Sequence, residues 1–146
     1  MRILMVNWKQ VAEDDLRKYG SIHAAVENNR QQIALLEDEL RGVKAIPVES
    51  GPHSVKVSGD ENINRLVMKM ELEEILARNE QRLKLIENGL EGLDREERLA
   101  LEYFYINRRR NAADSLCEAL CVERTTAYKI RGQALHKYIL RAYGLV

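Results

Sequence analysis

Aromatic residues, prolines and cysteines are scarce in this chain of 146 residues, and each scarcity excludes a class of structure. Aromatics make up 5%, and valine, isoleucine and threonine form no alternating runs between turn residues, so strands are not expected. Cys117 and Cys121 lie one helical turn apart without a second ligand pair, which predicts buried core cysteines in a reducing cytoplasm and no metal. No apolar run is long enough to span a bilayer.

The residue patterns of catalysis are also missing. No nucleophile–base pair, phosphate-binding glycine loop or paired carboxylates can be recognised, and no catalytic or metal-binding motif includes His23, His53 or His136. We therefore expect neither an enzyme nor a bound cofactor. Glu, Leu, Lys, Arg, Ala and Gln fill long stretches and are good helix formers, which predicts an all-α protein.

Charge is distributed unevenly although 23 basic residues balance 23 acidic ones. Residues 1–93 hold 13 basic and 16 acidic residues, whereas residues 107–146 hold 8 and 3. This asymmetry predicts a basic binding segment carried on a more neutral support.

Two long stretches with heptad spacing predict helices over about 11–41 and 60–88. The apolar seam of the first contains Tyr19, Ile22, Val26, Ile33, Leu36, Leu40 and Val43. That of the second contains Met68, Leu72, Ile75, Leu83, Ile86 and Leu90. Each seam is interrupted by an asparagine, at positions 29 and 79.

A long antiparallel, coiled-coil-like hairpin would pair residues whose numbers have a constant sum. A sum of 108 pairs Leu40 with Met68, Leu36 with Leu72, Ile33 with Ile75, Ile22 with Ile86, and Asn29 with Asn79. We hypothesise that the two asparagines meet and fix the register, as a buried asparagine does in coiled coils. Alternatively, each points to solvent at a seam edge. The same seam could also join two copies of the chain into a homodimer.

Turn-forming residues mark the predicted boundaries. A linker at about 43–60 contains Pro47 and Pro52, and proline cannot continue a helix. Gly89 and Gly92 are typical of a helix end, and Asp94 with Glu97 resembles a capping box that opens the next helix. The sequence thus predicts a hairpin domain over 1–90 and a second domain over 91–146.

The second domain has the order of a helix-turn-helix unit. Helices are expected over 95–106 and about 112–120, followed by a turn at 120–122 and a last helix from Glu123 through Tyr138. Leu116, Cys117, Leu120, Val122, Ala127, Ile130 and Leu135 would form its core.

The second helix of such a unit enters the DNA major groove, where arginine reads guanine, glutamine reads adenine and threonine contacts thymine methyls or phosphates. The basic break before the unit, at 107–111, is expected to contact phosphates. The predicted DNA-binding residues are Arg124, Thr125, Thr126, Tyr128, Lys129, Arg131, Gln133, Arg108, Arg109 and Arg110.

These residues bear a family resemblance. Residues 113–131 resemble the helix-turn-helix of region 4 of sigma-70-type factors, as do Leu93-Asp94-Arg95-Glu96-Glu97-Arg98 before it and Gln133-Ala134-Leu135-His136-Lys137 after it. Cys121 stands where that family usually has glycine, which adopts a left-handed conformation more easily. Asn7-Trp8-Lys9, residues 55–59 and Ala142-Tyr143-Gly144 also resemble ArpU/RinA-type late transcription regulators of Firmicutes phages and prophages.

The resemblance implies a cytoplasmic, prophage-type transcription regulator that binds double-stranded DNA and contacts RNA polymerase, with no membrane association. Its promoter-melting regions have no recognisable counterpart here, so a complete sigma factor is not expected. Two alternatives stay open. One is a DNA-packaging protein like the small subunit of phage terminase, and the other is a coiled-coil adaptor that contacts proteins only.

Overall fold

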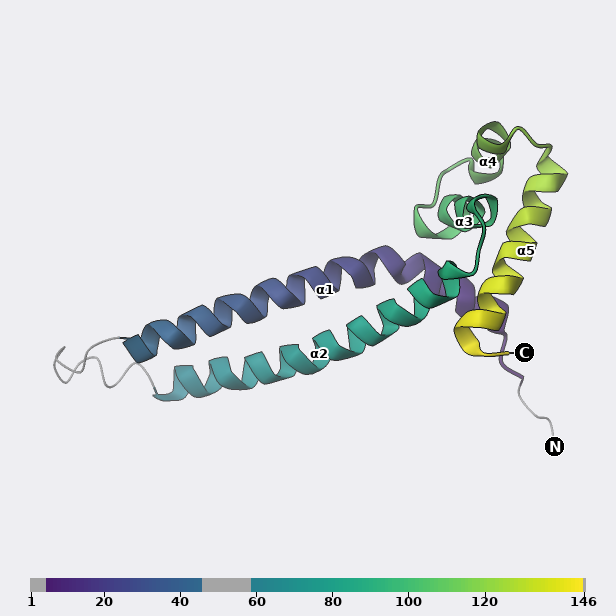
Figure 1. The fold of residues 1–146 in the computed structure, drawn as a ribbon. Coiled ribbons are helices and arrows are strands. Elements are labelled where there is room, and N and C mark those ends of the chain that lie inside the picture. Colours follow the sequence, from purple (N-terminus) through teal and green to yellow (C-terminus); the bar gives the residue numbers. More distant parts are fainter. Residues whose placement is uncertain (1–4, 46–58, 146) are drawn as a thin grey trace. The chain divides into compact units, whose positions relative to one another are not determined.

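The computed structural model describes residues 5–45 and 59–145, and these are helical without a strand, which confirms the all-α prediction (Figure 1). The elements are α1 (Trp8–Ala45), α2 (Gly59–Glu91), α3 (Arg95–Leu101), the π-helix η1 (Glu102–Ile106), α4 (Ala112–Leu120) and α5 (Arg124–Tyr143). The predicted linker overlaps the ends of α1 and α2, and its remainder lies outside the described residues.

Packing divides the described chain into two compact units, and both long helices contribute to each. The C-terminal unit contains residues 5–22 and 82–145, and the hairpin unit contains residues 23–45 and 59–81. Residues 5–22 and 82–90, which the sequence placed with the hairpin, therefore pack with the C-terminal helices.

The core of the C-terminal unit is built from both ends of the chain. Leu16 of α1, Leu90 of α2, Leu101 of α3 and Tyr138 of α5 are at most 1% exposed and belong to one cluster. Gly89 makes room for Tyr138, because a Cβ at this position would lie 2.6 Å from a carbon of the tyrosine ring. The ends of α1 and α2 are thus packed against α5.

Polar contacts fix the ends of these helices. The Tyr143 hydroxyl donates to Asp15 at 2.7 Å, and the Arg141 guanidinium donates to the Asn88 carbonyl at 2.7 Å. The predicted capping box is confirmed, since the Glu97 amide donates to Asp94 at 2.8 Å and the Asp94 amide to Glu97 at 3.2 Å. The buried Glu97 also pairs with Lys137 of α5 at 2.9 Å.

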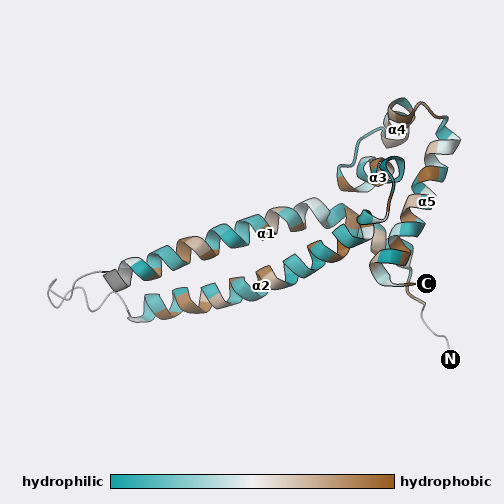
Figure 2. Cartoon of the chain, viewed as in Figure 1, coloured by the Kyte–Doolittle hydropathy of each residue, from teal (hydrophilic) through white to brown (hydrophobic). Residues whose placement is uncertain are grey.

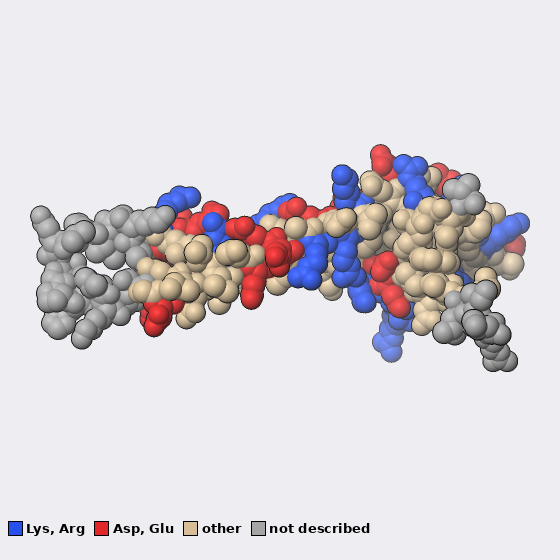
Figure 3. Space-filling model, turned by 90° about the horizontal axis from the view of Figure 1, so that it is seen from below, with Lys and Arg blue, Asp and Glu red and all other residues tan. Residues whose placement is uncertain are grey.

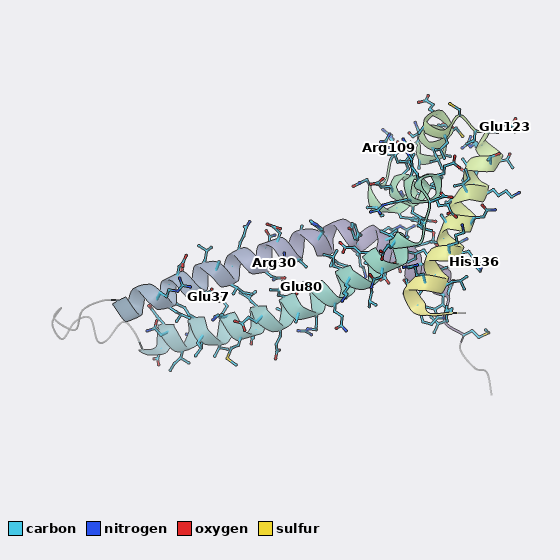
Figure 4. All side chains as sticks on the ribbon, viewed as in Figure 1. Arg30, Glu37, Glu80, Arg109, Glu123 and His136 are labelled. Carbon is cyan, nitrogen blue, oxygen red and sulfur yellow. The ribbon has the colours of Figure 1, made fainter. Side chains whose placement is uncertain are left out.

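In the hairpin unit α1 and α2 lie side by side and antiparallel (Figure 1). The Asn79 amide donates to the Asn29 side-chain oxygen at 3.2 Å, which confirms the predicted meeting of the two asparagines. Arg30 pairs with Glu80 at 3.1 Å, next to the asparagines; Figure 4 labels both residues. These contacts show that the register of the hairpin lies near the predicted sum.

Two of the predicted apolar pairs are wrong in detail. Met68 and Ile75 are 54% and 38% exposed, so they do not fill the seam opposite Leu40 and Ile33. The less exposed positions of this part of α2 are Arg65, Lys69, Leu72, Leu76 and Asn79. Arg65 and Lys69 turn toward α1 because they form ion pairs with Glu39 at 3.0 Å and Glu37 at 3.5 Å.

Because Arg65 and Lys69 face α1, an apolar stripe lies on the opposite, outer side of α2. Ile63, Leu66, Val67 and Met70 follow helical spacing and are 49–59% exposed. Hydrophobic residues are visible along this part of α2 in Figure 2, and Figure 3 shows an uncharged surface on the hairpin beside the grey residues. The hairpin unit therefore presents apolar side chains while it turns charged ones toward its seam.

Candidate nucleic-acid interface

Helices α4 and α5 are joined by a tight turn of three residues, Cys121 to Glu123. Cys121 has φ 55° and ψ 47°, the left-handed conformation that ends many helices and that glycine adopts most easily. The Val122 amide donates to the Cys117 carbonyl at 3.2 Å, which satisfies a carbonyl at the end of α4. Glu123 then has an extended backbone and precedes α5, as labelled in Figure 4.

Six of the seven residues predicted for the small core of this unit pack together there. Ala100, Leu116 and Ala127 are fully buried, and Cys117, Leu120, Val122 and Ile130 pack against them. Leu135 belongs to the larger cluster of the C-terminal unit. The alanine at 127 allows close approach of α5 to α4. The expectation that both cysteines are buried is wrong for Cys121, which is exposed because it lies in the turn.

The predicted DNA-binding residues separate into two groups on α5 and the loop before α4. Thr125, Thr126, Lys129 and Gln133 are exposed on the side of α5 that faces away from the buried Ala127 and Ala134. We call these four residues the outer face of α5. The other six line a cavity on the adjacent side of the helix: Arg108, Arg109, Arg110, Arg124, Tyr128 and Arg131.

This cavity, which we call the arginine cavity, has a volume of about 330 Å³ and is lined by six arginines. Five were predicted, and the sixth, Arg17, comes from α1. The acidic residues Glu13 and Asp114 also line it, so positive charge dominates its wall. Sequence reasoning missed Arg17 because its position depends on the packing of α1 beside η1, which no local pattern reveals.

Aromatic rings position several of these guanidinium groups. The Cζ of Arg109 lies 3.8 Å from the ring centre of Tyr103, and Figure 4 labels Arg109 in the loop before α4. Arg131 lies 4.9 Å from the ring centre of Phe104 and 5.0 Å from that of Tyr128. Such contacts hold a cation in place without neutralising it.

Two tyrosines contribute to the electrostatics of the cavity wall. Burial and then a hydrogen bond with Glu13 raise the pKa of Tyr105 to about 12, so its hydroxyl is neutral at pH 7. A hydrogen bond with Tyr128, and then the negative charge of Asp114, raise the pKa of Arg124 above its usual value. Arg124 therefore stays charged at physiological pH.

The π-helix η1 supplies the rings of Tyr103, Phe104 and Tyr105. The Asn107 amide donates to the Glu102 carbonyl at 2.8 Å, five residues back, in place of the α-helical spacing. This local widening was not predicted from the sequence, which indicated one regular helix to Ile106. It orients Tyr103 toward the α4–α5 core and Tyr105 toward the core of the C-terminal unit.

Other kinds of site receive no support from the described residues. Across residues 5–45 and 59–145, no group of three or more His, Cys, Asp or Glu residues is placed to hold a metal ion. Within the same ranges, no helix combines the length and apolar character needed to cross a membrane. The chain matches no protein-family model, no curated protein and no solved structure.

Proposed function

We propose that this chain is a sequence-specific, double-stranded DNA-binding transcription regulator in which α4, the Cys121 turn and α5 act as a helix-turn-helix. The observation that carries the proposal is the separation of α5 into an exposed outer face and a flank that lines the arginine cavity. A helix that reads bases needs free polar side chains in the groove and cations beside the phosphates.

The outer face has suitable chemistry for reading bases. Gln133 can form two hydrogen bonds with adenine, Thr125 and Thr126 offer hydroxyl and methyl groups, and Lys129 adds a positive charge. All four side chains are exposed and lie within the first three turns of α5. Because Ala127 and Leu116 are fully buried, α5 is fixed to α4 and can present this face rigidly.

The hairpin unit would supply a partner surface. Its outer stripe of Ile63, Leu66, Val67 and Met70 favours contact with a protein, and we propose that it forms a homodimer or docks to a partner such as RNA polymerase. The same stripe favours the rival function, a coiled-coil adaptor that contacts proteins only. DNA binding by the full chain separates these two functions.

The direct test is to select preferred duplexes from a random pool with the full chain and then measure affinity by fluorescence anisotropy at several salt concentrations. With about five phosphate contacts, the log–log salt slope should lie near −4 to −5. Gln133→Ala should weaken binding to the selected site by about 1–3 kcal/mol and relax one base position. No duplex binding at low salt would overturn the proposal.

A matched pair of lysines tests the role of the outer face. Lys129→Ala removes a charge from the outer face, whereas Lys84→Ala removes one from the exposed surface of α2. We expect Lys129→Ala to reduce affinity and flatten the salt slope by about one, and Lys84→Ala to change neither. Equal effects of the two substitutions would place the DNA-binding surface elsewhere.

A further inference from the structure

The arginine cavity contains a contribution from the start of the chain that the helix-turn-helix itself does not need. Arg17 lies on α1, and its Cζ lies 5.7 Å from the ring centre of Tyr105. It faces the same cavity as Arg108, Arg110 and Arg124, which follow it by about ninety or more residues in the sequence. The fold thus adds a guanidinium group from α1 to the basic loop before α4.

Positive charge in this cavity is poorly compensated. Within the described part of the chain, Arg17 pairs only with Asp14, at 3.4 Å, and both side chains are about half exposed. Arg108, Arg109, Arg110, Arg124 and Arg131 form no ion pair with a carboxylate among the same residues. Six guanidinium groups facing two carboxylates favour an anionic ligand.

The start of α4 opens on the same cavity. Residues 111–114 line it, and no side chain forms a capping hydrogen bond at Asn111. The first amide groups of this nine-residue helix are therefore free to donate, and the positive end of its dipole adds to the arginines. Helix amides and arginines together are the donor set that binds phosphate in proteins.

We propose that the arginine cavity is a phosphate-binding site to which Arg17 of α1 contributes directly. Resting on the proposed function, the ligand is a phosphate of the DNA backbone, held while the outer face of α5 reads the bases. A free nucleotide or inorganic phosphate shares this chemistry, and the cavity's 330 Å³ lies at the lower end of the volumes of small-ligand sites. The consequence is that α1 helps to position the chain on DNA.

The DNA arm of the test uses adjacent residues of α1. Arg17→Gln and Lys18→Gln remove one positive charge each, but only Arg17 lines the cavity, whereas Lys18 is exposed and outside it. Arg17→Gln should weaken duplex binding about tenfold and reduce the magnitude of the log–log salt slope by about 0.9. Lys18→Gln should leave both quantities unchanged, and circular dichroism checks that both variants are folded.

The second arm uses inorganic phosphate alone, titrated into the full chain in a buffer without other multivalent anions. Saturable binding that is weakened by both Arg17→Gln and Arg110→Gln supports the cavity as the site. Arg110 lies in the exposed loop before α4, so its substitution keeps the test valid if Arg17→Gln does not fold.

The two arms distinguish failure of the site from failure of the proposed function. Phosphate binding without any duplex binding would keep the phosphate site, overturn the regulator and make a free phosphate compound the ligand. Duplex binding that neither Arg17→Gln nor Arg110→Gln changes, together with no phosphate binding, would overturn the site and keep the regulator. Loss of duplex binding by Lys18→Gln equal to that by Arg17→Gln would also overturn the site.

Discussion

The same two helices are packed in different ways along their lengths. In the C-terminal unit, α1 and α2 pack with α5, and Ala12, Leu16 and Leu90 are at most 1% exposed. In the hairpin unit, α1 and α2 have only each other among the described residues, and Val26, Asn29 and Leu36 are the buried positions there, at 4–8% exposure. A third helix converts a narrow seam into a closed core.

This difference in packing indicates which of the two units is the more stable. Two helices bury one stripe each, so the hairpin unit relies on exposed ion pairs and one asparagine hydrogen bond for specificity. Units with few buried apolar contacts open locally at a lower free energy. The C-terminal unit is therefore expected to be the more stable part, and the substitutions below test that comparison.

The largest effect is expected from Leu16→Ala. Leu16 is fully buried in the closed core, so its truncation should cost about 2–5 kcal/mol in the free energy of unfolding. Leu36→Ala in the hairpin should cost less, because Leu36 borders an open groove of about 450 Å³. Urea unfolding of the full chain followed by circular dichroism measures both, and Leu35→Ala, at a 63% exposed position, is the control. Equal costs for Leu16 and Leu36 would contradict the comparison.

Overpacking at Gly89 should have the next largest effect. The new Cβ of Gly89→Ala would lie 2.6 Å from Tyr138 and 2.9 Å from Ala142, so α2 and α5 must separate. We expect a cost of about 1–3 kcal/mol, reduced by the better helix propensity of alanine. Gly20→Ala is the control, since nothing lies within 4 Å of its Cβ, and it should be neutral or stabilising. Similar melting temperatures for the two variants would show that α5 does not pack tightly here.

The asparagine pair tests the register of the hairpin. Asn29→Leu removes the acceptor of the bond from Asn79 and should cost about 1 kcal/mol, because the half-buried Asn79 can still reach water. The double variant with Asn79→Leu should recover that stability but lose a unique register, seen as broadened amide resonances or a mixture of oligomers. Asn28→Leu, at an exposed neighbouring position, is the control. If the double variant gave one sharp set of resonances, the asparagine pair would not be what determines the register of the hairpin.

Much of the fold could be predicted from local sequence. Caps and turns have local signals, which is why the Asp94–Glu97 capping box and the bounds of α4 agree with the structure. The asparagine pair was also predictable, since both helices repeat with the same spacing. The orientation of α2 about its own axis was not predictable, because its apolar pattern offers two possible faces and nothing local shows that Arg65 and Lys69 pair with residues of α1.

The candidate site was also predictable only in part, because its residue types can be read from the sequence but their packing cannot. The residue types of α5 indicate a polar helix start, but only the packed structure separates the outer face, such as Lys129, from the cavity side, such as Arg131. Arg17 is recognisable only after α1 is packed in the C-terminal unit. Contacts between residues so distant in sequence depend on tertiary packing, which composition and helical periodicity do not specify.

The smallest effect is expected from the exposed ion pair of the hairpin. Arg30 and Glu80 lie 3.1 Å apart with side chains 59% and 44% exposed, so a double-mutant cycle should give a coupling of about 0.2–1 kcal/mol. The pair Lys137–Glu97 in the C-terminal unit should couple more strongly, because the Glu97 side chain is 6% exposed and also accepts from Asp94.

Changes in salt concentration and pH should further distinguish the coupling of Arg30–Glu80 from that of Lys137–Glu97. Coupling between Arg30 and Glu80 should nearly vanish at 1 M salt, where the Debye length is about 3 Å, while that of the partly buried pair should persist. Glu97 raises the pKa of Lys137, so the stability from this pair is complete below the ordinary lysine pKa and is lost as pH rises through the raised value. Cycles measured at neutral pH and at a pH well above the ordinary lysine pKa should therefore give different couplings for Lys137–Glu97. The same salt dependence for both pairs would mean that water reaches Glu97 as freely as it reaches the hairpin surface.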